Sequence, residues 1–289
     1  MRVFVTGATG FVGSAVVREL IGAGHQVLGL ARSDAGAASL AAAGVDVLRG
    51  SLEDVESLKR GAAAADGVIH TAFIHDFTTF AANAEIDKIA IAAMADTLAG
   101  TDKPLLVTSG CLGLPTEDAT PPVGFPRKSE EAGLAAAAKG IRAMVIRLPP
   151  SVHGDGDHGF VPALIELARE KGFSMYVGEG ANPWSAVHRL DAAKLYRLAL
   201  EKGVAGARYH GIGDEGIPTR ELAEIIGKRL NVPAVSKTPE EATQLLGFIG
   251  HVLALGGRTS SAQTRERLGW KPIEPGLVAD LEHGRYFDM

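Results

Sequence analysis

Residues 6–13 read Thr-Gly-Ala-Thr-Gly-Phe-Val-Gly, and this stretch decides the fold. Its glycines stand at positions 7, 10 and 13, with the spacing Gly-x-x-Gly-x-x-Gly. An apolar run at 2–6 precedes the stretch, and apolar residues spaced for one helix face follow it from 11 to 23. Such glycines make a tight strand-to-helix turn, let backbone approach a pyrophosphate and allow close helix–sheet packing. The sequence predicts a strand, a phosphate-binding turn and a helix whose free N–H groups face a dinucleotide.

Strand-like and helix-like patterns alternate through the first half of the chain. The further strand-like runs are 26–30, 45–49, 67–73, 104–109, 141–148 and 207–211. The helical patterns among them are 36–43, 53–64 and 79–99. Strands that are apolar on both faces and alternate with helices are typical of parallel sheets. We therefore expect a doubly wound parallel α/β sheet of the Rossmann type.

The pattern changes after residue 148. Residues 149–159 combine proline, glycine, aspartate and histidine, which indicates a loop. Helical patterns follow at 161–171 and 191–202, and residues 238–241 (Thr-Pro-Glu-Glu) form a capping signal for another helix. The last ~75 residues are typical of a small, mainly helical part.

We therefore expect residues 1–150 with about 184–213 to form the dinucleotide-binding domain. Residues of about 151–183 and 214–289 are expected to form a smaller, mainly helical substrate-binding part.

Composition narrows the class of protein. The 289 residues carry a net charge of −5 with no Lys/Arg block, so no nucleic-acid partner is expected. A single cysteine excludes an intrachain disulfide and fits a reducing compartment. No apolar stretch is long enough to span a membrane, and the N-terminus does not resemble a signal peptide. We expect a soluble cytoplasmic protein with no membrane partner.

The end of the second predicted strand indicates which cofactor is bound. Dinucleotide folds that prefer NAD place Asp or Glu there, to bind the ribose diol. This chain has Ala31 at that position, followed by Arg32 and Ser33. A guanidinium matches a 2′-phosphate in charge and in fork geometry, and a hydroxyl adds a donor. The residues favour NADP(H).

The chain resembles the short-chain dehydrogenase/reductase superfamily, in its extended or atypical, epimerase/dehydratase-like branch. The glycine motif of that branch is Thr-Gly-x-x-Gly-x-x-Gly. Segments GVIHTAF (67–73) and LLVTSG (105–110) are similar to its fourth and fifth strands. Segment IRAMVIRLPPSVHGDGD (141–157) is similar to the sixth strand and its Arg-Pro-x-x-Val-Tyr-Gly loop, and AVHRLDAAKLYRLALE (186–201) to the later Val-His-Val-Asp-Asp-Val-Ala segment.

The motif and the resemblance together imply a set of cofactor-binding residues. They are Gly7, Thr9, Gly10, Phe11, Val12, Gly13, Arg32, Ser33, Ser51, Leu52, Thr71, Ala72, Phe73, Leu148, Pro149 and Ser151.

Three departures from the family pattern bear on the chemistry. Ser51 replaces the Asp of Gly-Asp-Leu, and His153 replaces the Tyr of Val-Tyr-Gly. The catalytic Tyr-x-x-x-Lys is absent, because no tyrosine is followed by lysine four residues later. Alignment on Glu131 puts Arg127 at the lysine position and Val123 at the tyrosine position. Reduction of a carbonyl then needs another proton donor, whereas an iminium substrate needs none.

Replacement catalytic groups are sought at the carboxyl edge of the sheet, where ligands bind. Thr108 and Ser109 end the fifth predicted strand; the spacing back from Gly113 favours Thr108, and the strand end favours Ser109. His75 follows the fourth strand and titrates near neutral pH. The alternatives are a hydroxyl that only closes a strand and a solvated loop histidine.

Four further residues are expected on the substrate side by position: Cys111, His153, Trp184 and His188. A lone cysteine without a paired histidine is also typical of a small packed side chain. The loop spacing His-x-Asp-x-Asp-His at 153–158 matches no helix-borne zinc pattern, so we predict no metal. We interpret these residues as a mobile lid or a substrate loop, and call them the lid loop.

These features favour an NADP(H)-dependent reductase that transfers hydride to a small carbonyl- or imine-type substrate. Two alternatives stay open: a non-catalytic, NADP-binding redox sensor, and a nucleotide-sugar epimerase or dehydratase. By analogy with the family, the helix predicted at 79–99 is a candidate dimer face, so a homodimer is one possible state.

Overall fold

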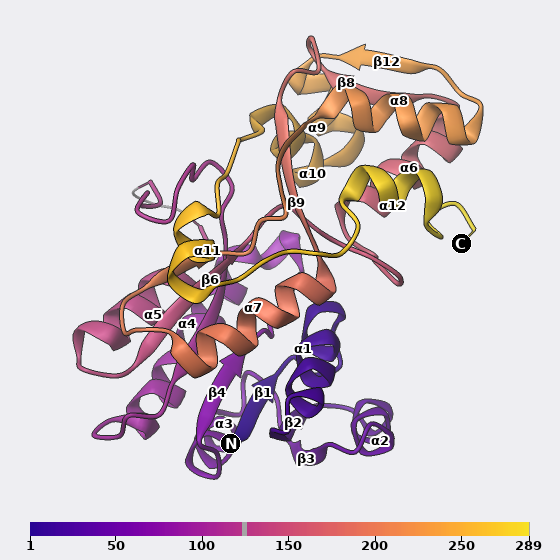
Figure 1. Cartoon of the computed structure of the whole chain (residues 1–289). Helices are drawn as coiled ribbons and strands as arrows, with labels where there is room; N and C mark the ends of the chain where they lie inside the picture. The colour runs from indigo at the N-terminus through magenta and orange to yellow at the C-terminus, as the bar shows by residue number, and fades with distance from the viewer. Residues whose placement is uncertain (123–125, 289) are drawn as a thin grey trace.

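A computed structural model describes residues 1–122 and 126–288 of the chain, and its centre is a sheet of seven parallel strands (Figure 1). In spatial order these strands are β10 (Arg208–His210), β6 (Ala143–Leu148), β5 (Leu105–Gly110), β4 (Gly67–His70), β1 (Arg2–Thr6), β2 (Gln26–Ala31) and β3 (Asp46–Arg49). The order reverses between β1 and β4, so the carboxyl ends of these two strands form the crevice in which doubly wound sheets bind ligands.

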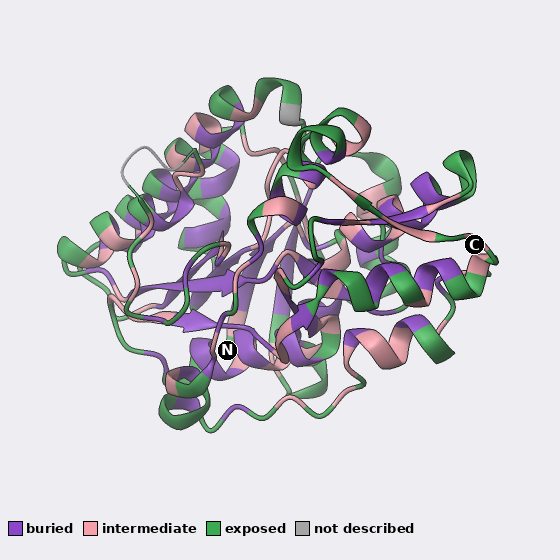
Figure 2. Cartoon of the chain, turned by 90° about the horizontal axis from the view of Figure 1, so that it is seen from above, coloured by how far each residue is buried: buried purple, intermediate pink, exposed green. Residues whose placement is uncertain are grey.

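Helices cover both faces of the sheet. One face carries α1 (Phe11–Gly22), α2 (Asp34–Ala42) and α7 (Arg189–Lys202), and the other carries α3 (Val55–Ala63), α4 (Phe80–Leu98) and α5 (Ser129–Ala138). Side chains of β1 alternate between the two layers: Val3 and Val5 pack toward α1 and α7, whereas Phe4 packs toward α3 and α4. Figure 2 shows the strands buried between the helices. The doubly wound Rossmann fold is confirmed.

The rest of the chain forms a smaller, mainly helical part with its own core. It contains a three-stranded sheet of β11 (Asp214–Pro218), β9 (Pro183–His188) and β7 (Ser151–His153), and a pair of β12 (Ala234–Lys237) and β8 (Ser174–Val177). Its helices are α6 (Phe160–Lys171), α8 (Thr219–Leu230), α9 (Pro239–Leu246), α10 (Phe248–Leu255), α11 (Ala262–Leu268) and α12 (Leu277–His283). A 3-10 turn, η1 (Phe77–Thr79), precedes α4. The capping box predicted at Thr238 is present at the start of α9.

Two local expectations were wrong. The strand predicted at 67–73 ends at His70, and residues 71–73 leave the sheet beside the glycine turn, where Thr71 bonds to the Thr6 carbonyl. The loop predicted at 149–159 contains β7, which pairs in parallel with β9. The two-domain division stays a prediction, and within it α11 packs back onto α7 and β10. Across the described ranges, no helix is long and apolar enough to cross a membrane.

Candidate active site

The glycine turn between β1 and α1 has a shape that only glycines allow. Gly7 has a φ of +69°, and a Cβ added there would lie 2.7 Å from the Ala72 nitrogen. A Cβ at Gly13 would lie 2.0 Å from the Gly7 oxygen, so α1 could not begin so close to β1. No side chain caps α1 at Gly10, which leaves its first N–H groups available to an acceptor. This cradle fits the pyrophosphate of a dinucleotide.

The end of β2 presents a free cation. Ala31 is buried, whereas Arg32 is exposed and has no hydrogen bond or ion pair with any described residue. Ser33 caps α2, because its Oγ accepts a hydrogen bond from the Gly36 nitrogen at 3.1 Å. As an acceptor in that bond, the Ser33 hydroxyl can still donate its proton. Arg32 and Ser33 therefore offer donors to a ligand beside the glycine turn.

Other predicted cofactor residues have defined local roles. Thr71 donates its hydroxyl to the Thr6 carbonyl at 2.7 Å, which holds residues 71–73 against the glycine turn. Ser51 accepts from the nitrogens of residues 53 and 54 and so stabilises the turn before α3, next to Leu52. Leu148 and Pro149 are buried where β6 ends, at the same edge of the sheet. Contact of these residues with a cofactor stays a prediction.

A buried hydrogen-bonded network runs behind this edge. The Thr6 Oγ1 and His70 Nδ1 are 2.8 Å apart, and His70 Nε2 lies 2.9 Å from Asp87 Oδ1. Ser129 donates to the other Asp87 oxygen at 2.5 Å, and Arg127 Nε donates to Ser129 Oγ at 3.0 Å. Burial raises the pKa of Asp87, but the hydrogen bonds and positive charges around it outweigh burial and lower the pKa overall. The network anchors Arg127 to β4 and α4.

Arg127 extends from the network to the carboxyl edge. Its Nη2 donates to the Thr108 carbonyl at 3.2 Å, and its guanidinium lies 4.3 Å from the centre of the Phe73 ring. The Thr108 hydroxyl bonds to the carbonyl of β4 and lies 2.7 Å from the Tyr196 hydroxyl, so it is engaged in the core. The Ser109 hydroxyl has no partner among the described residues. Ser109 is also buried, at 2% exposed, so of the two predicted hydroxyls it is the one that the described protein leaves without a partner.

His75 lies beside this group, with its ring centre 5.2 Å from that of Phe73. The residue is exposed, and partial desolvation together with the charge of Arg127 lowers its pKa. His75 is thus near Arg127 without bonding to it. Val123, aligned with the tyrosine of the family, lies outside the described residues.

Two residues expected on the substrate side are instead packed in the interior. Cys111 is fully buried, its Sγ donates to the Leu148 carbonyl at 3.3 Å, and burial raises its pKa to about 12. Trp184 is also fully buried and donates its indole N–H to Ser151 Oγ at 2.8 Å. Because neither side chain reaches a surface, their interpretation as substrate contacts is wrong for this structure.

The two histidines expected there also have structural partners. His153 is buried, and its Nδ1 lies 2.7 Å from Asp280 Oδ2, on α12. His188 is half-buried and caps α7 by accepting from the Leu190 nitrogen. Their rings lie edge-on, 5.4 Å apart. Within the part of the chain that the structure describes, no group of three His, Cys, Asp or Glu is suited to a metal ion.

Sequence reasoning missed Arg189, the first residue of α7. Its guanidinium lies 4.9 Å from the centre of the Phe11 ring, at the start of α1. The signal was present, because Arg189 stands where the family segment Val-His-Val-Asp-Asp has its second valine. A charged residue in an apolar position of a motif near the cofactor indicates a ligand or a special packing role.

Comparisons with known proteins agree with this geometry. The model of the NAD dependent epimerase/dehydratase family matches residues 3–99. An uncharacterised protein of Schizosaccharomyces pombe is 50% identical over 99% of this chain and all of its own length. The 2-alkyl-3-oxoalkanoate reductase of Stenotrophomonas maltophilia is 30% identical over 82% of this chain and 78% of its own.

Solved structures share the fold. DesIV, a dTDP-glucose 4,6-dehydratase from Streptomyces venezuelae with NAD and TYD bound, has a TM-score of 0.79 at 20% identity, covering 100% of this chain and 97% of its own. The glycine turn, the order of the sheet and these relatives lead to one assignment: the chain belongs to the short-chain dehydrogenase/reductase superfamily, in its extended, atypical branch of nicotinamide-dependent enzymes.

Proposed function

We propose that the protein is an NADP(H)-dependent oxidoreductase that reduces a carbonyl or imine group of a small organic molecule. The observation that carries the choice of cofactor is Arg32, an exposed cation without an ion-pair partner among the described residues, at the end of β2. Beside it, Ser33 keeps a free hydroxyl proton. A 2′-phosphate is the group that these donors match, and no carboxylate stands at the end of β2 to repel it.

The residues at the carboxyl edge support a reduction without the usual tyrosine. A bound nicotinamide supplies the hydride. Arg127 and Ser109 stabilise the negative charge that develops on the substrate oxygen, because both offer N–H or O–H donors there. Arginine keeps its proton, so the proton that completes an alcohol comes from elsewhere. With its lowered pKa, His75 is mainly neutral at neutral pH and relays a proton from water.

The relatives support a reductase over the sugar enzymes. One relative that covers most of the chain is named as a reductase of an oxoalkanoate. The family description and the dehydratase fold keep an epimerase or dehydratase as the second candidate. Tyr196 cannot supply their acid, since it is fully buried against Thr108 and burial raises its pKa.

Cofactor binding tests the first half of the proposal. We expect NADPH and NADP to raise the melting temperature more than NADH and NAD do, because the better ligand gives the larger shift. Arg32→Ala should weaken NADPH binding by roughly 10- to 100-fold and leave NADH binding unchanged, since a charged hydrogen-bonding partner is lost. Arg49→Ala is the matched control, an exposed arginine of β3 paired with Asp34. Equal affinity of the wild-type protein for NADPH and NADH, or an Arg32→Ala variant that binds NADPH as tightly as the wild type, would refute the role of Arg32.

Enzyme assays test the second part of the proposal, the reduction of a carbonyl or imine group. Oxidation of NADPH by members of a carbonyl and imine panel is expected, with loss of most activity in Ser109→Ala and Arg127→Met while NADPH still binds. Tight NADPH binding with no turnover of any panel member would instead identify a redox sensor. Copurification with NAD, and stabilisation by nucleotide sugars, would favour the epimerase or dehydratase.

A further inference from the structure

Six side chains form two groups of ring and cation contacts at the carboxyl edge of the sheet. One group is Arg127, Phe73 and His75, the other is His158, Phe11 and Arg189, and we call the two together the cationic arc. The two guanidinium groups lie over Phe73 and Phe11 at 4.3 and 4.9 Å. The two histidine rings lie edge-on to the same phenylalanines, at 5.2 and 5.8 Å. Between the two halves of the arc the link is electrostatic, because the charge of His158 lowers the pKa of His75.

The two arginines of the arc have no bonded carboxylate partner. Among the described residues, neither Arg127 nor Arg189 forms an ion pair or a hydrogen bond with an Asp or Glu. Asp87 is behind the arc and bonds to His70 and Ser129. Asp157 is buried and bonds to Tyr286 and to the nitrogen of Gly159.

One further carboxylate lies near the arc. Asp155 raises the pKa of Arg189 by its charge, but it is exposed and does not contact that residue. Partial desolvation and the nearby Arg18 have the larger effect and lower the pKa of Arg189. Asp87 acts on Arg127 by its charge and is linked to it through Ser129. Arg189, in contrast, carries a positive charge that no bonded carboxylate neutralises among the described residues.

Backbone geometry directs Arg189 toward the arc. A Cβ at Gly154 would lie 3.5 Å from Arg189 Cγ, and one at Gly156 would lie 4.0 Å from its Nη1. Both glycines have positive φ, at +125° and +83°, so the lid loop bends close over the arginine side chain where other residues would be strained. Glycine in the lid and phenylalanine in α1 thus enclose an unpaired arginine from two sides.

From this arrangement we infer that the substrate carries an anionic group, a carboxylate in the first instance, which the cationic arc binds next to the reacting carbonyl. The inference rests on the proposed oxidoreductase function and names its substrate class. Arginine binds carboxylates through two parallel hydrogen bonds, and the aromatic rings hold the guanidinium planes in place. The substrate class is an oxo acid, and its reduced product is a hydroxy acid.

The phosphates of the cofactor are the other anionic groups expected at this edge. Two observations favour the substrate as the source of the anionic group that the arc binds. The pyrophosphate already has the glycine cradle and the N–H groups of α1, and the 2′-phosphate has Arg32 and Ser33. The arc also extends to Arg127 and His75, which follow β4 and precede α5, on the side where the reacting group is expected.

Binding to the NADP-loaded protein tests the inference. The probes are hydroxy acids of several chain lengths, with the hydroxyl one to three carbons from the carboxylate, and their methyl esters. Isothermal titration calorimetry should give at least one acid that binds roughly 10- to 100-fold more tightly than its own ester, because a charged hydrogen-bonding partner is present only in the acid. Arg189→Gln should remove that difference and change NADP affinity by no more than about twofold.

Two controls keep the result specific. Arg18→Gln removes an exposed, unpaired charge on α1 near Arg189 but outside the arc, and it should keep the preference for the acid. Arg189→Lys keeps the charge and loses the bidentate fork, and it should restore part of the preference. Thermal unfolding and circular dichroism of each variant show that the protein is folded.

The contrary outcomes are distinct. If no acid binds more tightly than its ester to a wild-type protein that does bind NADP, the inference fails alone. If Arg189→Gln weakens NADP binding strongly and leaves the preference for the acid intact, Arg189 serves the cofactor and the inference also fails. A wild-type protein that binds none of the four dinucleotides overturns the proposed function and this inference with it.

Discussion

At the scale of single residues, Asp87 shows how a buried charge is kept ionised. It is 1% exposed, yet two hydrogen bonds satisfy both of its oxygens and Arg127 lies nearby. Asp87→Asn should lower the free energy of unfolding by about 3 kcal/mol, because it breaks a buried pair and leaves His70 without its charged partner. Urea titration measures the change. Asp102→Asn, at an exposed aspartate without a partner in the described part of the chain, should change it little.

The lowered pKa of Asp87 also predicts how the stability of the protein depends on pH. The pKa of Asp87 is lower in the folded protein than its ordinary value of 3.8, so the unfolded chain binds this proton more readily. The stability that Asp87 contributes is therefore fully present well above pH 3.8 and is lost as the pH falls below it, through the folded-state pKa. Wild-type protein should lose stability faster than Asp87→Asn as acid is added below that pH. Parallel curves for the two proteins would contradict the assigned network.

Sequence reasoning at this scale succeeded where a residue type has one physical use. Only glycine tolerates the φ of +69° and the close contacts of the turn, so Gly7 and Gly13 could be identified from spacing alone. Arginine and tryptophan have many uses. Arg189 and Trp184 are five residues apart in one segment, yet one lies over Phe11 at the site and the other donates to Ser151 in the core. Tertiary packing decides between such outcomes, and local sequence does not contain it.

At the scale of elements, α1 can begin close to β1 only because residue 13 is a glycine, which has no Cβ. Gly13→Ala would place a Cβ 2.0 Å from the Gly7 oxygen, so the helix must move away from β1. We expect a loss of about 1 to 3 kcal/mol in stability from this overpacking, and loss of most NADPH affinity as the cradle opens. Chemical denaturation and fluorescence titration with NADPH measure the two effects.

The other end of the same helix provides the control. A Cβ at Gly22 would meet nothing within 4 Å. Gly22→Ala should therefore stabilise the protein by about 0.5 to 1 kcal/mol, because alanine loses less backbone entropy in a helix, and NADPH affinity should not change. If both variants bound NADPH like the wild type, the close approach of α1 to β1 would not matter for the cofactor.

Elements with strong periodicity were predictable, and short ones were not. The alternation of strand-like and helix-like runs predicted every strand of the central sheet, because the inner strands are apolar runs buried on both faces. Strand β3, at the edge of the sheet, is only half-buried or exposed. Strand β7 has three residues between prolines and a glycine, so local propensity indicated a loop there. Its pairing partner, β9, lies about thirty residues further along the chain, and only the folded molecule brings the two together.

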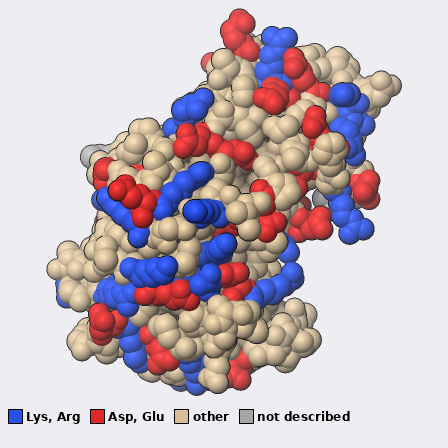
Figure 3. Space-filling view, viewed as in Figure 1, with Lys and Arg blue, Asp and Glu red and all other residues tan. Residues whose placement is uncertain are grey.

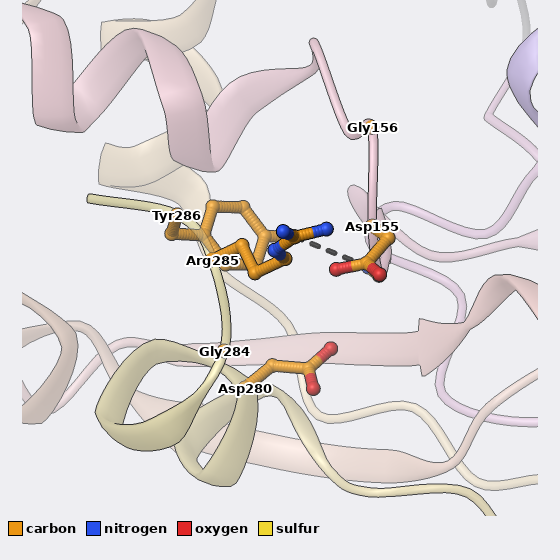
Figure 4. Close-up of a pocket in the computed structure, with 7 residues that line it drawn as sticks. Asp155, Gly156, Asp280, Gly284, Arg285 and Tyr286 are labelled. Carbon is orange, nitrogen blue, oxygen red and sulfur yellow. Dashed lines mark hydrogen bonds between the residues drawn. The ribbon is translucent and has the colours of Figure 1, made fainter. Parts of the chain in front are cut away.

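At the scale of the whole molecule, charge is spread and contacts between distant segments are specific. Lys and Arg alternate with Asp and Glu over the face in Figure 3, so this face has no extended field of one sign. The C-terminal segment, in contrast, returns to the lid loop. Tyr286 points its ring toward the loop that carries Asp155 and Gly156, across a small pocket (Figure 4). Its hydroxyl accepts from the Gly154 nitrogen at 3.2 Å and donates to Asp157 at 2.7 Å.

This contact joins residue 286 to the start of α1, because the same loop carries His158 against Phe11. Burial raises the pKa of Asp157, so its carboxylate depends on the hydrogen bond from Tyr286. Tyr286→Phe should cost about 1 to 3 kcal/mol, since a buried carboxylate and a backbone N–H lose their partner. It should also speed hydrogen exchange of residues 154–159 and the dissociation of NADPH, with the glycine turn still formed.

Tyr176→Phe is the control, since that ring lies under Arg220 on α8 and its hydroxyl has no hydrogen bond with any described residue. Exchange in the lid should then match the wild type. Unchanged exchange and unchanged NADPH dissociation in Tyr286→Phe would mean that the lid holds its position without the C-terminal segment. Faster exchange confined to residues 154–159, together with faster NADPH dissociation, would mean that the contacts of Tyr286 help to set how long the cofactor stays bound.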